Sequence, residues 1–145
     1  MAAIRSAEVT WEHDLVHGQG HVRVDSGALP EFPVTWASRA EQSAGKTSPE
    51  ELLAAAHASC LAMALSAGLA RAQTPPDQLK VRATATFDKV GDAWRVTTME
   101  ISVLGKVPKS TGPQFEQAVK SAVENCPISQ ALKNNVTVRA SARLE

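Results

Sequence analysis

The sequence predicts an α+β fold with a mostly antiparallel sheet. Several short stretches alternate apolar and polar residues, a pattern typical of half-exposed strands. One long, Ala- and Leu-rich stretch in the middle of the chain predicts a single long helix. The order along the chain is strands, long helix, hairpin, helices and a last strand, which is typical of α+β proteins. The 145 residues contain no internal repeat or linker, so we expect one domain over residues 1–145.

The expected strands lie on both sides of the long helix. Gly18 and Gly20 mark a turn before the second strand, and Gly91-Asp92 predicts a hairpin turn between two long strands. The expected strands are Ile4–Glu12, His21–Asp25, Leu79–Val90, Ala93–Val107 and Val136–Leu144, with a short piece at Pro33–Trp36.

The long helix has a clear start signal. Ser48 is a good N-cap, Pro49 suits the first helical position, and the glutamate at the third position can close a capping box. The helix then continues as LLAAAHASCLAMALSAGLARA and ends before Pro75. It is apolar on nearly every face, so we expect it to be buried all round. A membrane span is the alternative, which the high Ala content and His57 disfavour.

The length of this helix predicts a homodimer. At about 1.5 Å per residue it is too long for a chain of 145 residues to cover on all sides. A second subunit that wraps around the helix would cover it.

Two further helices are expected near the C-terminus. Cys126-Pro127 begins a short helix, ISQALK, that ends at Asn134-Asn135. A longer helix begins at Gly112-Pro113 and carries an apolar stripe with helical spacing. The stripe consists of Phe115, Val119, Ala122 and Val123.

Composition disfavours several classes of partner. Fifteen basic and fifteen acidic side chains cancel, and no basic stripe is present, so neither nucleic acid nor an anionic membrane is an expected partner. The chain has no Tyr and only three Trp and three Phe, too few for a base-stacking surface. The N-terminal stretch MAAIRSAEVTWEHD has no apolar run after a basic start, so we expect a cytoplasmic protein.

The two cysteines, Cys60 and Cys126, indicate thiol redox chemistry, because cytosolic thiols stay reduced and rarely serve as structural staples. Cys60 lies mid-helix, where the helix dipole has faded and burial would raise the thiol pKa. It is therefore either an inert core residue or a reactive thiol beside a cation. His57 is one turn back, Arg39 lies in the upstream loop WASRAEQSAGK, and Lys46 is a further candidate.

Cys126 should occupy the N-cap of the short helix, where backbone N–H groups would stabilise its thiolate. The alternative is a simple substitute for the commoner Ser or Asn cap. His57 with Cys60 could form half of a Zn site, although only Cys126 and a carboxylate could complete its four ligands. Because the capping box needs only one glutamate, Glu50 is free for another task, such as holding an arginine by a bidentate ion pair.

The run TSPEELLAAAHASCLAMAL, with CPISQAL downstream, resembles the OsmC/Ohr family. These osmotically inducible and organic hydroperoxide resistance proteins are thiol-dependent peroxidases. The likeness covers essentially the whole chain. The pair Ala56-His57, the loop with Arg39 and the absence of Tyr are more similar to the OsmC branch.

The resemblance implies a role for each candidate residue. Cys60 matches the peroxidatic cysteine and Cys126 the resolving one, which together would form an intramolecular disulfide. Arg39 matches the arginine that holds the peroxide and stabilises the thiolate, and Glu50 matches the acid that pairs with it. Arg23 and Arg71 are the alternatives to Arg39.

The resemblance also implies an OsmC-like fold with a long buried central helix and an intertwined homodimer. It implies an organic hydroperoxide substrate, with hydrogen peroxide reduced less efficiently, and an external dithiol or lipoyl-type reductant in place of a cofactor or metal. The residues around Cys60 agree, since Leu53, Ala56, Leu61 and Ala64 offer only apolar contacts. Two alternatives are a small-molecule or metal-binding stress protein of the same fold and a structural dimer with inert cysteines.

Overall fold

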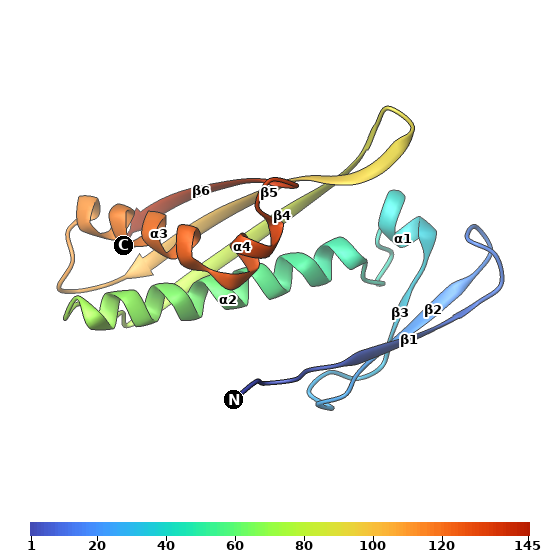
Figure 1. The fold of residues 1–145 in the computed structure, drawn as a ribbon, viewed down its shortest axis with the longest axis horizontal. Coiled ribbons are helices and arrows are strands. Elements are labelled where there is room, and N and C mark those ends of the chain that lie inside the picture. The colour runs from blue at the N-terminus through green and yellow to red at the C-terminus, as the bar shows by residue number, and fades with distance from the viewer. The chain divides into compact units, whose positions relative to one another are not determined.

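The computed structural model describes all 145 residues and has the α+β composition that the sequence predicts. Its contacts divide the chain into two compact units, Met1–Leu52 and Leu53–Glu145, and each is described by itself. The elements are β1 (Ala7–Glu12), β2 (Gln19–Val24), β3 (Phe32–Val34), α1 (Trp36–Ala40), α2 (Pro49–Arg71), β4 (Gln78–Val90), β5 (Ala93–Lys106), α3 (Gly112–Asn125), α4 (Pro127–Leu132) and β6 (Thr137–Leu144) (Figure 1).

The first unit is built on a three-stranded antiparallel sheet in the order β1-β2-β3. Trp11 pairs with Gly20 in the register of β1 and β2. A Cβ atom at Gly20 would come within 2.8 Å of the Trp11 ring, so only glycine leaves room for the indole there.

The short helix α1 was not predicted, because its sequence was interpreted as a polar loop. Thr35 is its N-cap: the Thr35 hydroxyl accepts from the Ser38 N–H at 3.0 Å, and the Ser38 hydroxyl accepts from the Thr35 N–H at 3.0 Å. Serine in the place of the usual Glu or Gln closes this capping box. Arg39 is therefore carried on a helical turn.

The second unit has a sheet in the order β4-β5-β6. β4 and β5 form the predicted antiparallel hairpin, with Gly91 at a positive φ of 64° in its turn. β6 pairs parallel with β5, so this sheet is mixed. A parallel neighbour requires a crossover connection, which α3 and α4 supply.

The core of the second unit lies between this sheet and its helices. Figure 1 shows α2, in green, running along the sheet, with α3 and α4, in orange, beside it. Met99, Ile101 and Val103 of β5 pack with Phe115 and Val119 of α3 and with the leucines of α2. The predicted apolar stripe of α3 therefore does face the core.

The start of α2 agrees with the predicted cap in part. The Ser48 hydroxyl accepts from the Glu51 N–H at 3.1 Å. The Glu51 carboxylate, however, accepts from the Thr47 hydroxyl at 2.8 Å and does not return to the Ser48 N–H. The box is half formed because a side-chain donor one residue upstream competes for the same carboxylate.

The expected burial of α2 on all sides is not met within one chain. His57, Leu61, Leu65 and Leu69 recur every fourth residue and are buried, whereas Met63 on another face is 71% exposed. The second unit supplies one sheet and the helices α3 and α4, which cover a single stripe of α2. By length and hydropathy alone α2 could also cross a membrane, a test that core helices of soluble proteins pass as well.

Candidate active site

The predicted site residues form two pairs, one in each unit. Arg39 and Glu50 meet in the first unit, and Cys60 and Cys126 meet in the second. The two alternatives to Arg39 are placed elsewhere: Arg23 pairs with Glu8 at 3.5 Å on the first sheet. Arg71 lies at the end of α2, about 16 Å along the helix from Cys60.

Arg39 of α1 and Glu50 of the first turn of α2 form a bidentate ion pair. The Arg39 Nε donates to Glu50 Oε1 at 3.0 Å and to Oε2 at 3.2 Å, and Nη2 donates to Oε1 at 2.8 Å. The Glu50 side chain is only 8% exposed, while that of Arg39 is 34% exposed. A carboxylate so buried needs a charged partner, and the fork geometry fixes the plane of the guanidinium.

Both cysteines are free thiols, Cys60 half-buried on α2 and Cys126 fully buried. Cys126 lies at the junction of two helices, as the C-cap of α3 and the predicted N-cap of α4. Its N–H donates to the Ala122 carbonyl at 2.8 Å, and its carbonyl accepts from the Gln130 N–H at 3.0 Å. These two bonds fix the backbone at Cys126, and the Cys60 thiol acts on the Cys126 thiol.

The surroundings shift the pKa values of the two thiols in opposite directions. Burial is the main cause that raises the pKa of Cys60; the Ile128 N–H lowers this pKa, and the neighbouring Cys126 thiol raises it again. Burial also raises the pKa of Cys126, but the Ser129 N–H, the Cys60 thiol, the Ser129 hydroxyl and the Ile128 N–H together outweigh it. The pKa of Cys126 is therefore held below its ordinary value.

The raised pKa of Cys60 matters for the role of attacking thiol that the family resemblance implies for this residue. Within the second unit no positively charged side chain contributes to the pKa of Cys60. A thiol in that position ionises readily only when a cation from elsewhere offsets the burial. Cys126, in contrast, has its stabilising groups within its own helix junction.

His57 is not the cation considered for Cys60. It is fully buried, and burial lowers its pKa, so the imidazole is neutral at neutral pH. Its Nε2 lies 2.7 Å from the Ser129 hydroxyl, and its Nδ1 has no hydrogen-bond partner. The Zn alternative has no support either, because the structure contains no cluster of three His, Cys, Asp or Glu side chains that could hold a metal.

Ser129 was not singled out in the sequence. It is the third residue after the N-cap Cys126, a position whose N–H ordinarily faces the cap side chain. This spacing from Cys126 was the one signal in the sequence that could have identified Ser129. Its contact with His57, 72 residues away in the chain, has no signature in the sequence.

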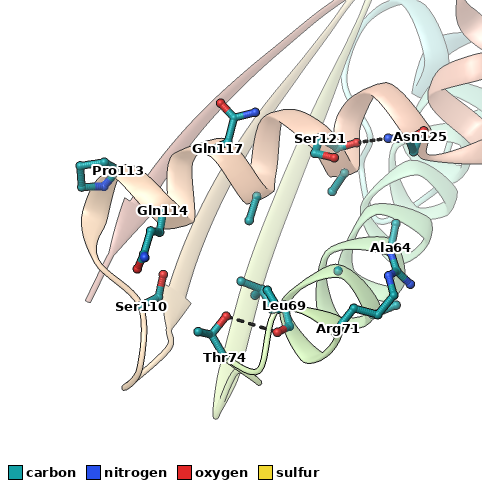
Figure 2. Close-up of a pocket in the computed structure, with 15 residues that line it drawn as sticks. Ala64, Leu69, Arg71, Thr74, Ser110, Pro113, Gln114, Gln117, Ser121 and Asn125 are labelled. Carbon is teal, nitrogen blue, oxygen red and sulfur yellow. Dashed lines mark hydrogen bonds between the residues drawn. The ribbon is translucent and has the colours of Figure 1, made fainter.

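A cavity of about 790 Å³ lies between the C-terminal half of α2 and α3. Figure 2 shows small and polar side chains from both helices lining it, with Ala64 and Asn125 near one end and Pro113 near the other. Neither cysteine lines the cavity, but Ala64 is one turn after Cys60 and Asn125 directly precedes Cys126.

Known proteins share both the sequence and the fold. The sequence profile of the OsmC-like protein family matches residues 41–141. The peroxiredoxin OsmC of Escherichia coli (strain K12) is 34% identical over 138 residues, 95% of this chain and 96% of that protein.

Two solved structures resemble the fold closely. The organic hydroperoxide resistance protein OhrB of Bacillus subtilis has a TM-score of 0.73 and 23% identity, over 95% of this chain and 98% of that one. The OsmC like protein from Mycoplasma pneumoniae has a TM-score of 0.77 and 11% identity, over 99% of both chains. At these identities the two structures establish the shared fold alone.

Acidification should destabilise the protein through His57. Burial lowers the folded-state pKa of His57 below its ordinary 6.5, so between the two values only the unfolded chain binds the proton. The stability gained by keeping the imidazole neutral is complete above the unfolded pKa and is lost as the pH falls towards the folded one, by at most about 1.4 kcal/mol per pH unit. Urea unfolding at about pH 7.5 and about pH 5.5 measures the loss.

The matched variant is His57→Gln, which keeps an N–H for Ser129 but does not titrate. Its free energy of unfolding should fall less than that of the wild type over the same interval. An equal fall in the two proteins would contradict the assignment to His57.

Proposed function

The chain belongs to the OsmC-like family, and we propose that it is a cysteine-based peroxidase that reduces organic hydroperoxides. The 34% identity to a protein named peroxiredoxin, over nearly the full length of both, supports the activity. The observation that carries the proposal is that the Cys60 and Cys126 thiols are neighbours, each of which shifts the pKa of the other. A peroxidase that closes an intramolecular disulfide needs two reduced sulfurs within reach of each other.

The proposed cycle has three steps. The Cys60 thiolate attacks one oxygen of the hydroperoxide, the O–O bond breaks, and Cys60 becomes a sulfenic acid while the leaving alkoxide takes a proton to form an alcohol. The Cys126 sulfur then attacks the Cys60 sulfur, forming the disulfide and releasing water. An external dithiol or lipoyl-type reductant returns both thiols by exchange, so no bound cofactor is required.

In this proposal Arg39 supplies the cation that Cys60 lacks within its own unit. Its guanidinium would lower the pKa of the Cys60 thiol and stabilise the negative charge on the leaving alkoxide. Glu50 is the acid that keeps the guanidinium in one orientation, through the three hydrogen bonds of their ion pair. We also propose a cytoplasmic location, where thiol reductants are abundant.

Cumene hydroperoxide should oxidise both thiols of the wild type at one equivalent. Cys60→Ser should abolish peroxide reduction because the attacking sulfur is gone. Cys126→Ser should allow one turnover and leave a sulfenic acid at Cys60 that dimedone traps and mass spectrometry locates. If Cys126→Ser blocks the first oxidation instead, the roles of the two cysteines are reversed, and if neither thiol reacts the protein is a binding protein of this fold.

Hydrogen peroxide is the substrate control in the same assay. The partly exposed apolar residues near Cys60, such as Leu53 and Ala64, can contact an alkyl group, whereas Leu61 is buried in the core and cannot. Burying on the order of 100 Å² of substrate would gain roughly 2.5 kcal/mol, somewhat under a hundredfold in kcat/KM. Equal kcat/KM values for the two peroxides would exclude the apolar contact.

Arg39→Ala should slow peroxide reduction at neutral pH and recover part of the rate at higher pH. Removing the cation leaves burial to raise the Cys60 pKa, so fewer molecules carry the thiolate. The measurement is the pH dependence of kcat/KM for cumene hydroperoxide. Arg39→Lys is the control, because it keeps the charge and loses the fork to Glu50; an alanine variant with an unchanged profile would move the role to another cation.

The protein should form a homodimer. Within one chain α2 exposes Met63 and several alanines opposite its buried stripe, an apolar surface that monomers rarely leave uncovered. Sedimentation at micromolar concentration should give twice the mass of one chain. Met63→Glu places a charge on the exposed face and should weaken the dimer, whereas a folded wild-type monomer would rule the dimer out.

A further inference from the structure

A buried polar pair lies beside Cys126. His57 on α2 and Ser129 on α4 are 0% and 7% exposed, and their Nε2 and Oγ atoms are 2.7 Å apart. The second ring nitrogen of His57, Nδ1, is buried without any partner. An unpaired buried polar atom costs free energy that an apolar side chain in the same place would avoid. Packing alone therefore gives no reason for a histidine here.

Ser129 connects this histidine to the sulfur of Cys126. Both its hydroxyl and its N–H act on the Cys126 thiol, while the same hydroxyl contacts His57. His57 thus contacts Ser129, and Ser129 in turn lowers the pKa of the Cys126 thiol. A neutral imidazole has one N–H, and when that proton is on Nε2 it donates to Ser129 Oγ. The hydroxyl proton of Ser129 is then free to point towards the sulfur of Cys126.

We propose that His57 and Ser129 form a buried donor relay that activates Cys126 for the disulfide-forming step. The proposal rests on the function proposed above and adds two residues to it. Both are positioning residues: Ser129 acts on the Cys126 thiol, whose pKa it lowers, and His57 acts through Ser129. A chain of donors that ends on a thiolate is stronger than a single neutral hydrogen bond.

The step balances as follows. The Cys126 thiol gives up its proton, and Ser129 donates a hydrogen bond to the resulting thiolate. This sulfur attacks the sulfur of the Cys60 sulfenic acid and the S–O bond of that group breaks. The departing hydroxide takes up the proton that Cys126 gave up and leaves as water. One S–S bond has formed, and no oxidant beyond the peroxide already reduced is used.

Few ionisable groups face Cys126. Cys60 faces it directly from α2, and His57 of the same helix reaches it through Ser129. No acidic or basic side chain of α3, α4 or the sheet contributes to its pKa. Apart from burial and the N–H groups of Ser129 and Ile128, the ionisation of this thiol therefore reports on the relay and on Cys60.

A direct test removes Cys60 from the measurement. In a Cys60→Ser background Cys126 is the only thiol, so the thiolate absorbance near 240 nm titrates it without any peroxide. Ser129→Ala and His57→Leu should each raise the titration midpoint by about one pH unit. Ser129→Thr keeps the hydroxyl and His57→Gln keeps an N–H, so both should bring the midpoint back towards that of the Cys60→Ser protein. The control Ser121→Ala, on the exposed face of α3, should leave the midpoint unchanged.

Two results of this titration would overturn the proposal. One is an unchanged midpoint in Ser129→Ala. The other is a midpoint in His57→Gln as high as in His57→Leu, which would mean that His57 has only a packing role. Because no peroxide is used, neither result depends on the peroxidase activity.

The second test follows the sulfenic acid in the chain with both cysteines. Ser129→Ala should lengthen the lifetime of the sulfenic acid trapped by dimedone, whereas the control Ser121→Ala should not. Below the thiol pKa, a rise of one unit reduces the thiolate tenfold while its higher basicity recovers part of its nucleophilicity, so the net slowing is about three- to fourfold. This slowing of disulfide formation should vanish at high pH.

The outcomes separate the two proposals. A wild type that forms no sulfenic acid contradicts the peroxidase function. A wild type that forms one, with equal lifetimes in wild type and Ser129→Ala below the thiol pKa, contradicts the relay alone.

Discussion

The packing of one stripe of α2 determines where the chemistry can occur. His57, Leu61 and Leu65 face the core formed by β5 and α3, and this fixes the rotation of the helix about its axis. Cys60 precedes Leu61 by one residue, so it stands about 100° away, at the edge of the buried stripe, as its half-buried state shows. The same rotation points His57 into the interior, against Ser129 of α4. If the apolar pattern of α2 were shifted by one residue, Cys60 would move away from Cys126 and His57 would move away from Ser129.

The two cysteines show how differently one side chain behaves in two backbone settings. In the middle of α2 the N–H groups of the helix itself are already used, so only the Ile128 N–H opposes burial, and the pKa of Cys60 is raised. At the start of α4 the N–H groups of Ile128 and Ser129 have no helical acceptor and act on Cys126. A cation for Cys60 must therefore come from a side chain. In the proposed function that side chain is Arg39, whose guanidinium is held by a nearly buried carboxylate.

Local signals predicted much of this arrangement, and long-range contacts account for what they missed. The Gly91 turn, the N-cap position of Cys126 and a glutamate spare for an arginine all follow from spacings of a few residues. The helix α1 was missed because five residues carry too little periodicity. Sequence order does not give strand direction, so the parallel pairing of β6 was not foreseen. The apolar faces of α2 predict that this helix is buried, but they do not tell which chain buries it. The expected burial on all sides was therefore wrong for the single chain.

The acidity difference between the thiols has a consequence for the return half of the proposed cycle. When a dithiol attacks the Cys60–Cys126 disulfide, the sulfur that leaves more easily is the one with the lower thiol pKa. The groups around Cys126 lower its pKa despite burial, so Cys126 is the better leaving group and the attack is directed at the sulfur of Cys60. Cys60 is also the more accessible of the two, since Cys126 is fully buried. Exposure and acidity therefore favour the same sulfur, so in the proposed cycle the mixed disulfide with the reductant forms at Cys60 and Cys126 is the departing sulfur.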